Sequence, residues 1–398
     1  MSAGTRASAR GTRGAFRFVL LVGAMSLFAD LTYEGMRAIV GPYLAILGAG
    51  ALAIGTVTGL GELLGYGLRV VSGRLSDRTR AFWPITIAGY VVQMSAVPLL
   101  ALAGSWPVAA ILIVLERVGK ATRNPPRDVM LSHAAKQIGG LGWAFGLHEA
   151  LDQLGALLGP IAMALVLAAR HGGYRLALGT LAIPAAITLG VLAVARVQYP
   201  RPEEMETHPP DVHAEGLPHR FWIYLAGAAL VAIGFADFPL IAFHFHDAST
   251  VSADAIPIFY GVAMGVSGLG SLVFGRLFDR SGIGILVPLT VVTAAFAPLV
   301  FLGGFWLALV GASLWGLGMG VHESIVPAAV APMVPIERRA SAYGLFTAAY
   351  GAFWFVGSVI IGALYTLSIG AAVAFCVAAE LAAIPFFVRV AKIARSGS

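Results

Sequence analysis

Long apolar runs alternate with short polar or charged stretches over almost the whole chain. A helix that crosses the hydrocarbon core of a bilayer needs about 20 apolar residues, and the runs have this length. The pattern predicts an all-α membrane protein with twelve transmembrane helices. They are expected at about 15–40, 51–72, 82–103, 106–125, 143–168, 174–198, 221–246, 253–275, 284–303, 306–326, 341–367 and 369–390.

The composition agrees with a polytopic membrane protein. Of 398 residues, 58% are hydrophobic and only 12% are charged, whereas a soluble domain carries about 25% charged residues. This leaves no room for a large soluble domain. The first apolar run follows a polar, basic start without a small-residue cleavage site, so we interpret it as a retained span rather than a signal peptide. The single cysteine, Cys376, excludes a disulfide within the chain.

The formal charge of +6 reflects topology rather than a nucleic-acid partner. Basic residues gather in alternate loops, and the loops between them hold almost none, apart from Arg170 and Arg175. The positive-inside rule then places both termini in the cytoplasm of a cell whose inner membrane holds the protein. The basic loop residues are Arg6, Arg10, Arg13, Arg17, Arg74, Arg78, Arg80, Arg123, Arg127, Lys136, Arg196, Arg201, Arg220, Arg276, Arg280, Arg338, Arg339, Arg389, Lys392 and Arg395.

The chain repeats itself. Gly73–Arg78 after the second span returns as Gly275–Arg280 after the eighth, and Ala144–Leu147 in the fifth returns as Ala342–Leu345 in the eleventh. The offsets, 275 − 73 = 202 and 342 − 144 = 198, are nearly equal, which is typical of a duplicated bundle. We therefore expect residues 1–198 to form an N-terminal six-helix bundle, 199–220 a Pro-rich cytoplasmic linker, and 221–398 a C-terminal six-helix bundle.

Each repeated segment is interpreted as a short charged turn. An Asp beside an Arg at the end of a helix can hold one of two conformations, and this favours a conformational lock; a turn that only anchors topology is the alternative. The lock residues would be Gly73, Asp77, Arg78, Gly275, Asp279 and Arg280.

These segments resemble the loop signature of the major facilitator superfamily, and the resemblance covers nearly the whole chain. In the fifth span, Gly146, Gly155, Gly159 and Pro160 match the spacing of that superfamily's antiporter signature, although Met163 stands where the signature has glycine. The resemblance implies two pseudo-symmetric bundles, a central cavity between them, alternating access, and proton-coupled export.

Ionisable residues inside the spans are the candidate site. Each costs about 2.5–3.5 kcal/mol at the bilayer centre, so it needs a partner or water. Spacings of four and three place Asp30, Glu34 and Arg37 on one helical face. We interpret the set as a substrate and proton site; the alternative is that pairs such as Glu34 with Arg37 are static ties. Glu62 and Glu380 are expected to be structural partners. The candidate residues are Asp30, Tyr33, Glu34, Arg37, Glu116, Arg117, Glu149, Asp152, Asp237, His322 and Glu323.

A metal site is a weaker prediction. His244, His246 and Asp247 carry ligands that suit a divalent ion, but His-x-His on a helix points its rings apart. An interfacial belt of aromatic and His side chains is the other interpretation, so we expect no bound metal and no cofactor.

The sequence therefore predicts a secondary transporter, not an enzyme, which exchanges protons for a small organic solute and works as a monomer. No phosphate-binding loop of the Gly-x-x-x-x-Gly-Lys-Ser/Thr type occurs, so an ion or solute gradient must supply the energy. A metabolite or divalent-metal carrier of the same fold remains an alternative. A membrane sensor is disfavoured because the short linker offers no output domain.

Overall fold

The computed structural model describes residues 3–135, 141–170, 172–200, 217–330, 333–334 and 339–396, and it is helical throughout these ranges apart from short connections. The first half contains α1 (Ala3–Ile46), α2 (Ala51–Thr79), α3 (Phe82–Leu99) with η1 (Leu100–Leu102), α4 (Trp106–Ala135), α5 (Leu141–Ala169), α6 (Tyr174–Thr180) and α7 (Ala182–Gln198). The second half contains α8 (His219–Gly234), α9 (Phe238–Asp247), α10 (Ile256–Ser281), η3 (Gly282–Ile285), α11 (Leu286–Thr293), α12 (Phe296–Leu302), α13 (Phe305–Ala328), α14 (Arg339–Leu367) and α15 (Ile369–Ser396).

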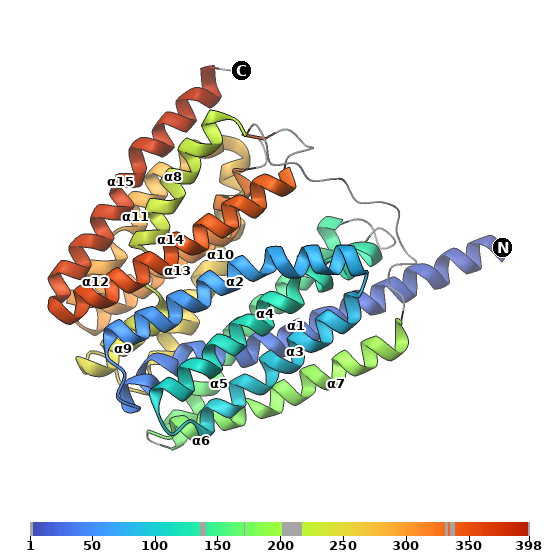
Figure 1. The fold of residues 1–398 in the computed structure, drawn as a ribbon, viewed down its shortest axis with the longest axis horizontal. Coiled ribbons are helices and arrows are strands. Elements are labelled where there is room, and N and C mark those ends of the chain that lie inside the picture. Colours follow the sequence, from blue (N-terminus) through green and yellow to red (C-terminus); the bar gives the residue numbers. More distant parts are fainter. Residues whose placement is uncertain are drawn as a thin grey trace.

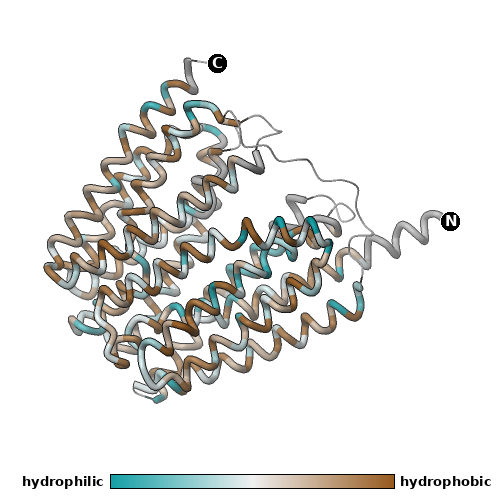
Figure 2. The backbone as a smooth tube through the Cα atoms, viewed as in Figure 1, coloured by the Kyte–Doolittle hydropathy of each residue, from teal (hydrophilic) through white to brown (hydrophobic). Residues whose placement is uncertain are grey.

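The predicted fold class is confirmed. Each of the twelve expected spans coincides with one helix or with a consecutive series of short ones, and ten segments are long and apolar enough to cross a membrane. An eleventh, within α10, is apolar over 16 residues, Ile256–Ser271. The remaining one, α4, is not among these segments and carries Glu116, Arg117, Lys120, Arg123 and Arg127 within its length. Figure 2 shows mostly hydrophobic helices, with hydrophilic positions in α4 and near several helix ends.

The predicted charged turns are wrong in their position. Residues 73–79 continue α2 and residues 275–281 continue α10. The chain turns one step later, where Arg80 and Gly282 have φ angles of 52° and 62°. In both segments the backbone N–H groups bond to carbonyl groups four residues earlier, as in any α-helix. The charged side chains therefore lie on the last turns of α2 and α10 and not in a turn between helices.

The helices form two groups that diverge from one another. In Figure 1, α1–α7 form one group and α8–α15 the other; they lie close at one end and separate toward the end that carries both chain termini, which we call the terminal side. Between the groups, α1 packs against α9 and α10, α2 against α14, and α5 against α10. The boundary of the two bundles at 199–220 stays a prediction, since residues 201–216 lie outside the described ranges.

The side opposite the termini is closed by direct backbone contact. A Cβ atom added at Gly41 of α1 would lie 1.9 Å from the carbonyl oxygen of Pro239 in α9. One added at Gly55 of α2 would lie 2.4 Å from the carbonyl oxygen of Ser358 in α14. Small residues allow helices to approach this closely where lipid supplies no hydrophobic drive between them.

Candidate functional site

A cavity of about 510 Å³ is lined by residues from both groups of helices. A smaller pocket of about 70 Å³ adjoins it, because both are lined by Glu34, Tyr66, Arg69 and Lys120. α1, α2, α4 and α5 form one wall, and α10, α13 and α14 form the other. We call the larger one the central cavity and the smaller one the inner pocket.

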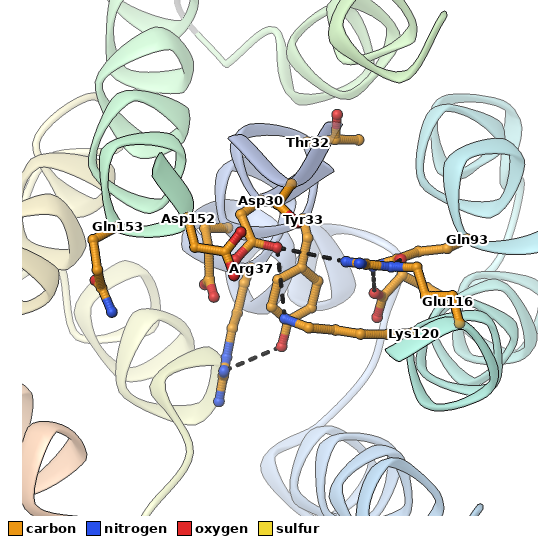
Figure 3. Close-up of polar contacts among 12 residues, drawn as sticks. Asp30, Thr32, Tyr33, Arg37, Gln93, Glu116, Lys120, Asp152 and Gln153 are labelled. Atoms are coloured by element: carbon orange, nitrogen blue, oxygen red, sulfur yellow. Dashed lines mark hydrogen bonds and ion pairs between the residues drawn. The ribbon is translucent and has the colours of Figure 1, made fainter. Parts of the chain in front are cut away.

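The predicted polar face of α1 points into the protein. Glu34 and Arg37 are buried, and Asp30 lines the central cavity. Glu34 does not pair with Arg37; it accepts a hydrogen bond from the Tyr260 hydroxyl on α10. Arg37 instead donates to the Tyr33 hydroxyl at 3.1 Å, as Figure 3 shows. Glu34 therefore connects α1 to α10, while the bond between Arg37 and Tyr33 stays within α1.

Glu62 of α2, expected to be a structural partner, lies at the centre of an ion network. Its Oε1 atom is 2.7 Å from Nη2 of Arg117 and 3.3 Å from Nη2 of Arg37. The same Arg37 nitrogen is 3.8 Å from Oδ1 of Asp237 in the other half. Arg117 is also 3.8 Å from the carboxylate of Glu116. This network joins α1, α2 and α4 to the second half.

Asp237 marks an interruption of the seventh predicted span. α8 ends at Gly234 and α9 begins at Phe238, so residues 235–237 are not helical. The Asp237 carboxylate accepts hydrogen bonds from Nε1 of Trp354 at 3.1 Å and from the Ser358 hydroxyl at 2.9 Å. These bonds and Arg37 satisfy a carboxylate that is 2% exposed, as burial of a charge requires.

Two further cations of α4 reach Asp30. Its carboxylate is 3.7 Å from Arg123 and 3.9 Å from Lys120, and Figure 3 shows Lys120 extending across the Tyr33 ring to it. The Lys120 nitrogen lies 3.7 Å from the centroid of that ring. Both distances to Asp30 exceed those of a direct hydrogen bond, so the acid is held loosely.

Arg123 and Arg127, assigned to a loop in the sequence analysis, belong to the site. α4 continues to Ala135 through Pro125 and Pro126, so both arginines lie inside the helix and are buried. Arg123 donates to Gln93 at 2.6 Å, and Gln93 donates to Glu116 at 2.8 Å. The positive-inside rule counts charge near the ends of a span and cannot distinguish a loop arginine from one facing a cavity.

The acids of α5 meet α1 because the two helices approach closely. Added Cβ atoms at Gly155 and Gly159 would lie 2.2 and 2.5 Å from carbonyl oxygens of α1. One result is that His148 Nε2 lies 2.8 Å from the Ser26 hydroxyl. Another is that the Asp152 carboxylate lies beside that of Asp30 (Figure 3). The predicted antiporter-type glycines therefore position titratable groups, and Pro160 of the same motif contacts α10 near Gly261.

Possible metal ligands occur on α5 and on α9. His148, Glu149 and Asp152 form a group whose possible ligand atoms all lie within 4.8 Å of one another. The weak metal candidates are not grouped: His244 pairs with the Tyr365 hydroxyl at 2.7 Å, while the His246 ring faces Tyr174. The Glu323 side chain lies outside the described residues.

The structure does not test the predicted lock. Arg78 and Arg280 are exposed. A Cβ atom added at Gly73 would lie 3.6 Å from the Cβ atom of Pro125 in α4. The side chains of Asp77 and Asp279 and the packing of Gly275 and Gly146 lie outside what the structure describes. The lock therefore stays a prediction.

The wall from the second half has a different chemistry. Its described lining residues are uncharged: Met264, Ser271, His322, Phe346, Thr347 and Tyr350. The His322 Nδ1 atom and the Tyr350 hydroxyl are buried and have no hydrogen-bond partner among the described residues. All described charged residues of the central cavity come from the first half.

Comparison with known proteins agrees with this architecture. Residues 20–322 match the Major Facilitator Superfamily. The chain belongs to this superfamily. An uncharacterised protein of Mycobacterium tuberculosis is 41% identical over 395 residues, 97% of this chain and 96% of that one. An uncharacterised MFS-type transporter of Methanocaldococcus jannaschii is 27% identical over 362 residues, covering 88% of this chain and 89% of the relative.

Solved structures share the fold at low identity. A peptide transporter POT in complex with sulfate superposes with a TM-score of 0.74 and 15% identity, over 96% of this chain and 94% of that one. The nucleoside transporter NupG superposes with a TM-score of 0.72 and 14% identity, over 94% of this chain and 98% of that one. The superfamily member is thus a multi-pass membrane transporter, and its substrate must be argued from its own cavity.

Proposed function

We propose that the protein moves a small amphipathic organic solute across the membrane by alternating access, in exchange for protons. The observation that carries this proposal is the two-sided cavity: charged groups of the first half face uncharged aromatic and polar side chains of the second. A solute with a polar end and an apolar ring can contact the charged wall and the aromatic wall at once. A fully hydrated ion would neither pack against the aromatic side chains nor pair with the buried polar atoms beside them.

Proton coupling is supported by the loosely held acids. Asp30 lies beside Asp152, and its carboxylate is 3.7 Å from Arg123 and 3.9 Å from Lys120. Two neighbouring carboxylates resist simultaneous ionisation, so one of them holds a proton more readily while the other is charged. A solute that enters the cavity changes their hydration and their partners, which links its binding to proton release.

The direction of transport and the orientation in the membrane are inferred from the glycine motif of α5 and from the basic loops. The spacing of Gly155, Gly159 and Pro160 resembles the antiporter signature and favours exchange over symport. The basic loops favour a cytoplasmic terminal side. In that orientation the structure represents the inward-open state in an inner membrane, since the opposite side is closed at Gly41 and Gly55.

A divalent-cation carrier is the second candidate, and the group of His148, Glu149 and Asp152 is what favours it. Against it stands Arg127, whose Nη1 donates at 3.0 Å to the same Ser26 hydroxyl that contacts His148. A guanidinium so close to the ligand atoms repels a divalent ion. The organic solute is therefore the better assignment.

The test begins with a panel of organic solutes and divalent ions on the purified protein, read by thermal shift at two pH values. Solutes that stabilise the protein are then followed in proteoliposomes that contain a pH-sensitive dye. We expect transport with a coupled proton flux, and we expect Asp30→Asn and Glu34→Gln to insert normally but to lose the coupled flux. If both variants moved the solute with unchanged pH dependence, the coupling assignment would be withdrawn.

A further inference from the structure

We infer that the solute is an organic anion with a planar ring, and that its anionic group binds between Arg69 and Lys120. This inference rests on the proposed function and names the substrate class of the same cavity. We call Arg69, Lys120 and the Tyr66 ring the anion subsite.

Arg69 is the cation of the central cavity that has no ion-pair partner among the residues that the structure describes. It belongs to α2, lines both the central cavity and the inner pocket, and is exposed to them. Its guanidinium lies 5.5 Å from the centroid of the Tyr66 ring, and it forms no ion pair with any residue that the structure describes. The other cations of the central cavity all have carboxylate partners: Lys120 and Arg123 have Asp30, and Arg127 has Asp128.

The inner pocket is positive. Four cations line it, namely Arg37, Arg69, Arg117 and Lys120, against two carboxylates, Glu34 and Glu62. Asp237 and Glu116, which also contact Arg37 and Arg117, do not line it. Glu62 is paired with Arg117 at 2.7 Å and with Arg37 at 3.3 Å. The unsatisfied positive charge therefore belongs to Arg69 and to Lys120, whose acid is 3.9 Å away.

The volume of this pocket limits the group that enters it. About 70 Å³ accommodates a carboxylate or a similar small anion, but not the whole of an organic molecule. A guanidinium and an ammonium flanking such a group give charge-assisted hydrogen bonds. The remainder of the solute must extend into the central cavity.

The second half supplies a surface for a ring. Phe346 and Tyr350 are stacked, with centroids 5.8 Å apart, and Tyr66 meets Tyr350 edge-on at 5.9 Å. A planar ring in the central cavity could join this cluster, since aromatic rings attract one another stacked or edge-on at centroid separations of about 4.5–7 Å. Because Tyr66 and Tyr350 come from opposite halves, a ring held here contacts both bundles at once.

Two buried polar atoms beside this surface have no hydrogen-bond partner among the described residues. The Tyr350 hydroxyl and His322 Nδ1 lack hydrogen bonds in the described structure, and the residues are 3% and 7% exposed. A buried polar group without a partner costs about 1–3 kcal/mol. A hydroxyl or carbonyl on the ring of the solute would remove this cost, so we expect the ring to carry one.

Three naphthalene compounds that differ only in their charged group provide the test: a naphthalene carboxylate, the corresponding alcohol and the corresponding methylammonium. Binding of each to the full-length protein in detergent is measured by isothermal titration. The carboxylate is expected to bind at least about tenfold more tightly than the other two, a difference of about 1.4 kcal/mol.

Variants assign the effect to residues. Arg69→Gln should weaken the carboxylate about tenfold and leave the alcohol unchanged. Arg74→Gln, five residues further along the same helix and outside both cavities, is the matched control and should change neither. With a hydroxynaphthalene carboxylate, Tyr350→Phe should remove the gain given by the ring hydroxyl.

The inference is overturned if the carboxylate fails to bind, if the ammonium binds as tightly, or if Arg69→Gln has no more effect than Arg74→Gln. These results are distinct from failure of the proposed function. A neutral or cationic solute that drives proton flux in proteoliposomes would overturn the anion subsite and leave the proton-coupled transporter intact.

Discussion

Two buried glutamates show how the same residue type takes opposite roles. Glu62 is held by two arginines at 2.7 and 3.3 Å. Glu380 of α15 is 0% exposed, and the Thr293 hydroxyl donates to its Oε2 atom at 3.2 Å, while Oε1 has no partner in the described structure. Glu62 is therefore ionised and compensated. An uncompensated charge at Glu380 would be too costly, so that side chain is expected to be neutral.

The first prediction is that Glu62→Gln strongly destabilises the protein. The substitution leaves Arg37 and Arg117 facing each other without their shared carboxylate, and removing one partner of a buried ion pair costs about 3–5 kcal/mol. We expect a marked fall in the apparent unfolding temperature in detergent. Glu149→Gln, whose side chain is exposed, is the control and should unfold like the parent. Equal unfolding temperatures for the two variants would contradict the role of Glu62.

The second prediction is that Glu380→Gln is tolerated. Glutamine has the shape of a neutral glutamic acid and can still accept the Thr293 hydrogen bond, so the unfolding temperature should shift little. An infrared spectrum supplies an independent check: the parent should show the carbonyl band of a protonated carboxyl group that the variant lacks. Loss of stability comparable to that of Glu62→Gln would show that Glu380 is ionised.

The position of a single residue could be predicted from the sequence only where it depends on the geometry of one helix. The spacing of Asp30, Glu34 and Arg37 fixed a common face because an α-helix repeats every 3.6 residues. Their partners could not be derived in this way. Glu62 and Asp237 reach Arg37 from other helices, and which of several buried acids meets an arginine depends on how helices cross, which spacing along the chain does not encode.

At the scale of elements, close backbone contacts determine which side of the protein is closed. α1 and α9, from different halves, touch at Gly41 and Pro239. The twelve helices themselves followed from apolar runs, but their ends did not: α4 extends past two prolines to Ala135, and the seventh span is broken at 235–237. Such extensions and breaks depend on burial in the bundle, where neighbouring groups satisfy the freed backbone.

The third prediction concerns this contact. In Gly41→Ala the new methyl carbon would lie 1.9 Å from the Pro239 carbonyl oxygen, so α1 and α9 must separate. The variant should therefore populate states that are open on the side opposite the termini. Accessibility of an engineered cysteine to a membrane-impermeant reagent on that side should rise. Gly67→Ala, which has no atom within 4 Å of the added carbon, should leave the accessibility unchanged.

At the scale of the whole molecule, the charged network lies where the two halves meet. Arg37 contacts Asp237, and Tyr260 contacts Glu34, so polar bonds cross between the halves beside the cavity. Their ionisation is thus coupled to the relative position of the halves. If solute or proton binding breaks one of these bonds, the preference between the two arrangements shifts by the difference in binding energy.

The fourth prediction is that the halves move as rigid bodies. Cys376 is the only cysteine and is buried, so a Cys376→Ser background permits spin labels at exposed positions. Thr79 and Ser281 end α2 and α10 on the terminal side, and Leu102 and Leu302 lie on the opposite side. When a transported solute and a pH gradient drive the cycle, the Thr79–Ser281 distance should shorten while the Leu102–Leu302 distance lengthens.

A pair within one half separates this motion from local rearrangement. Leu102 follows α3, and Leu176 lies in α6, which packs against that segment; the distance between labels at these positions should stay constant throughout the cycle. Opposite changes on the two faces with a fixed distance inside a half are what a rotation about the central cavity produces. If both faces opened together, or if the internal distance changed as much as the others, the charged network could not act as the joint between two rigid halves, and its acids would have to be assigned to stability alone.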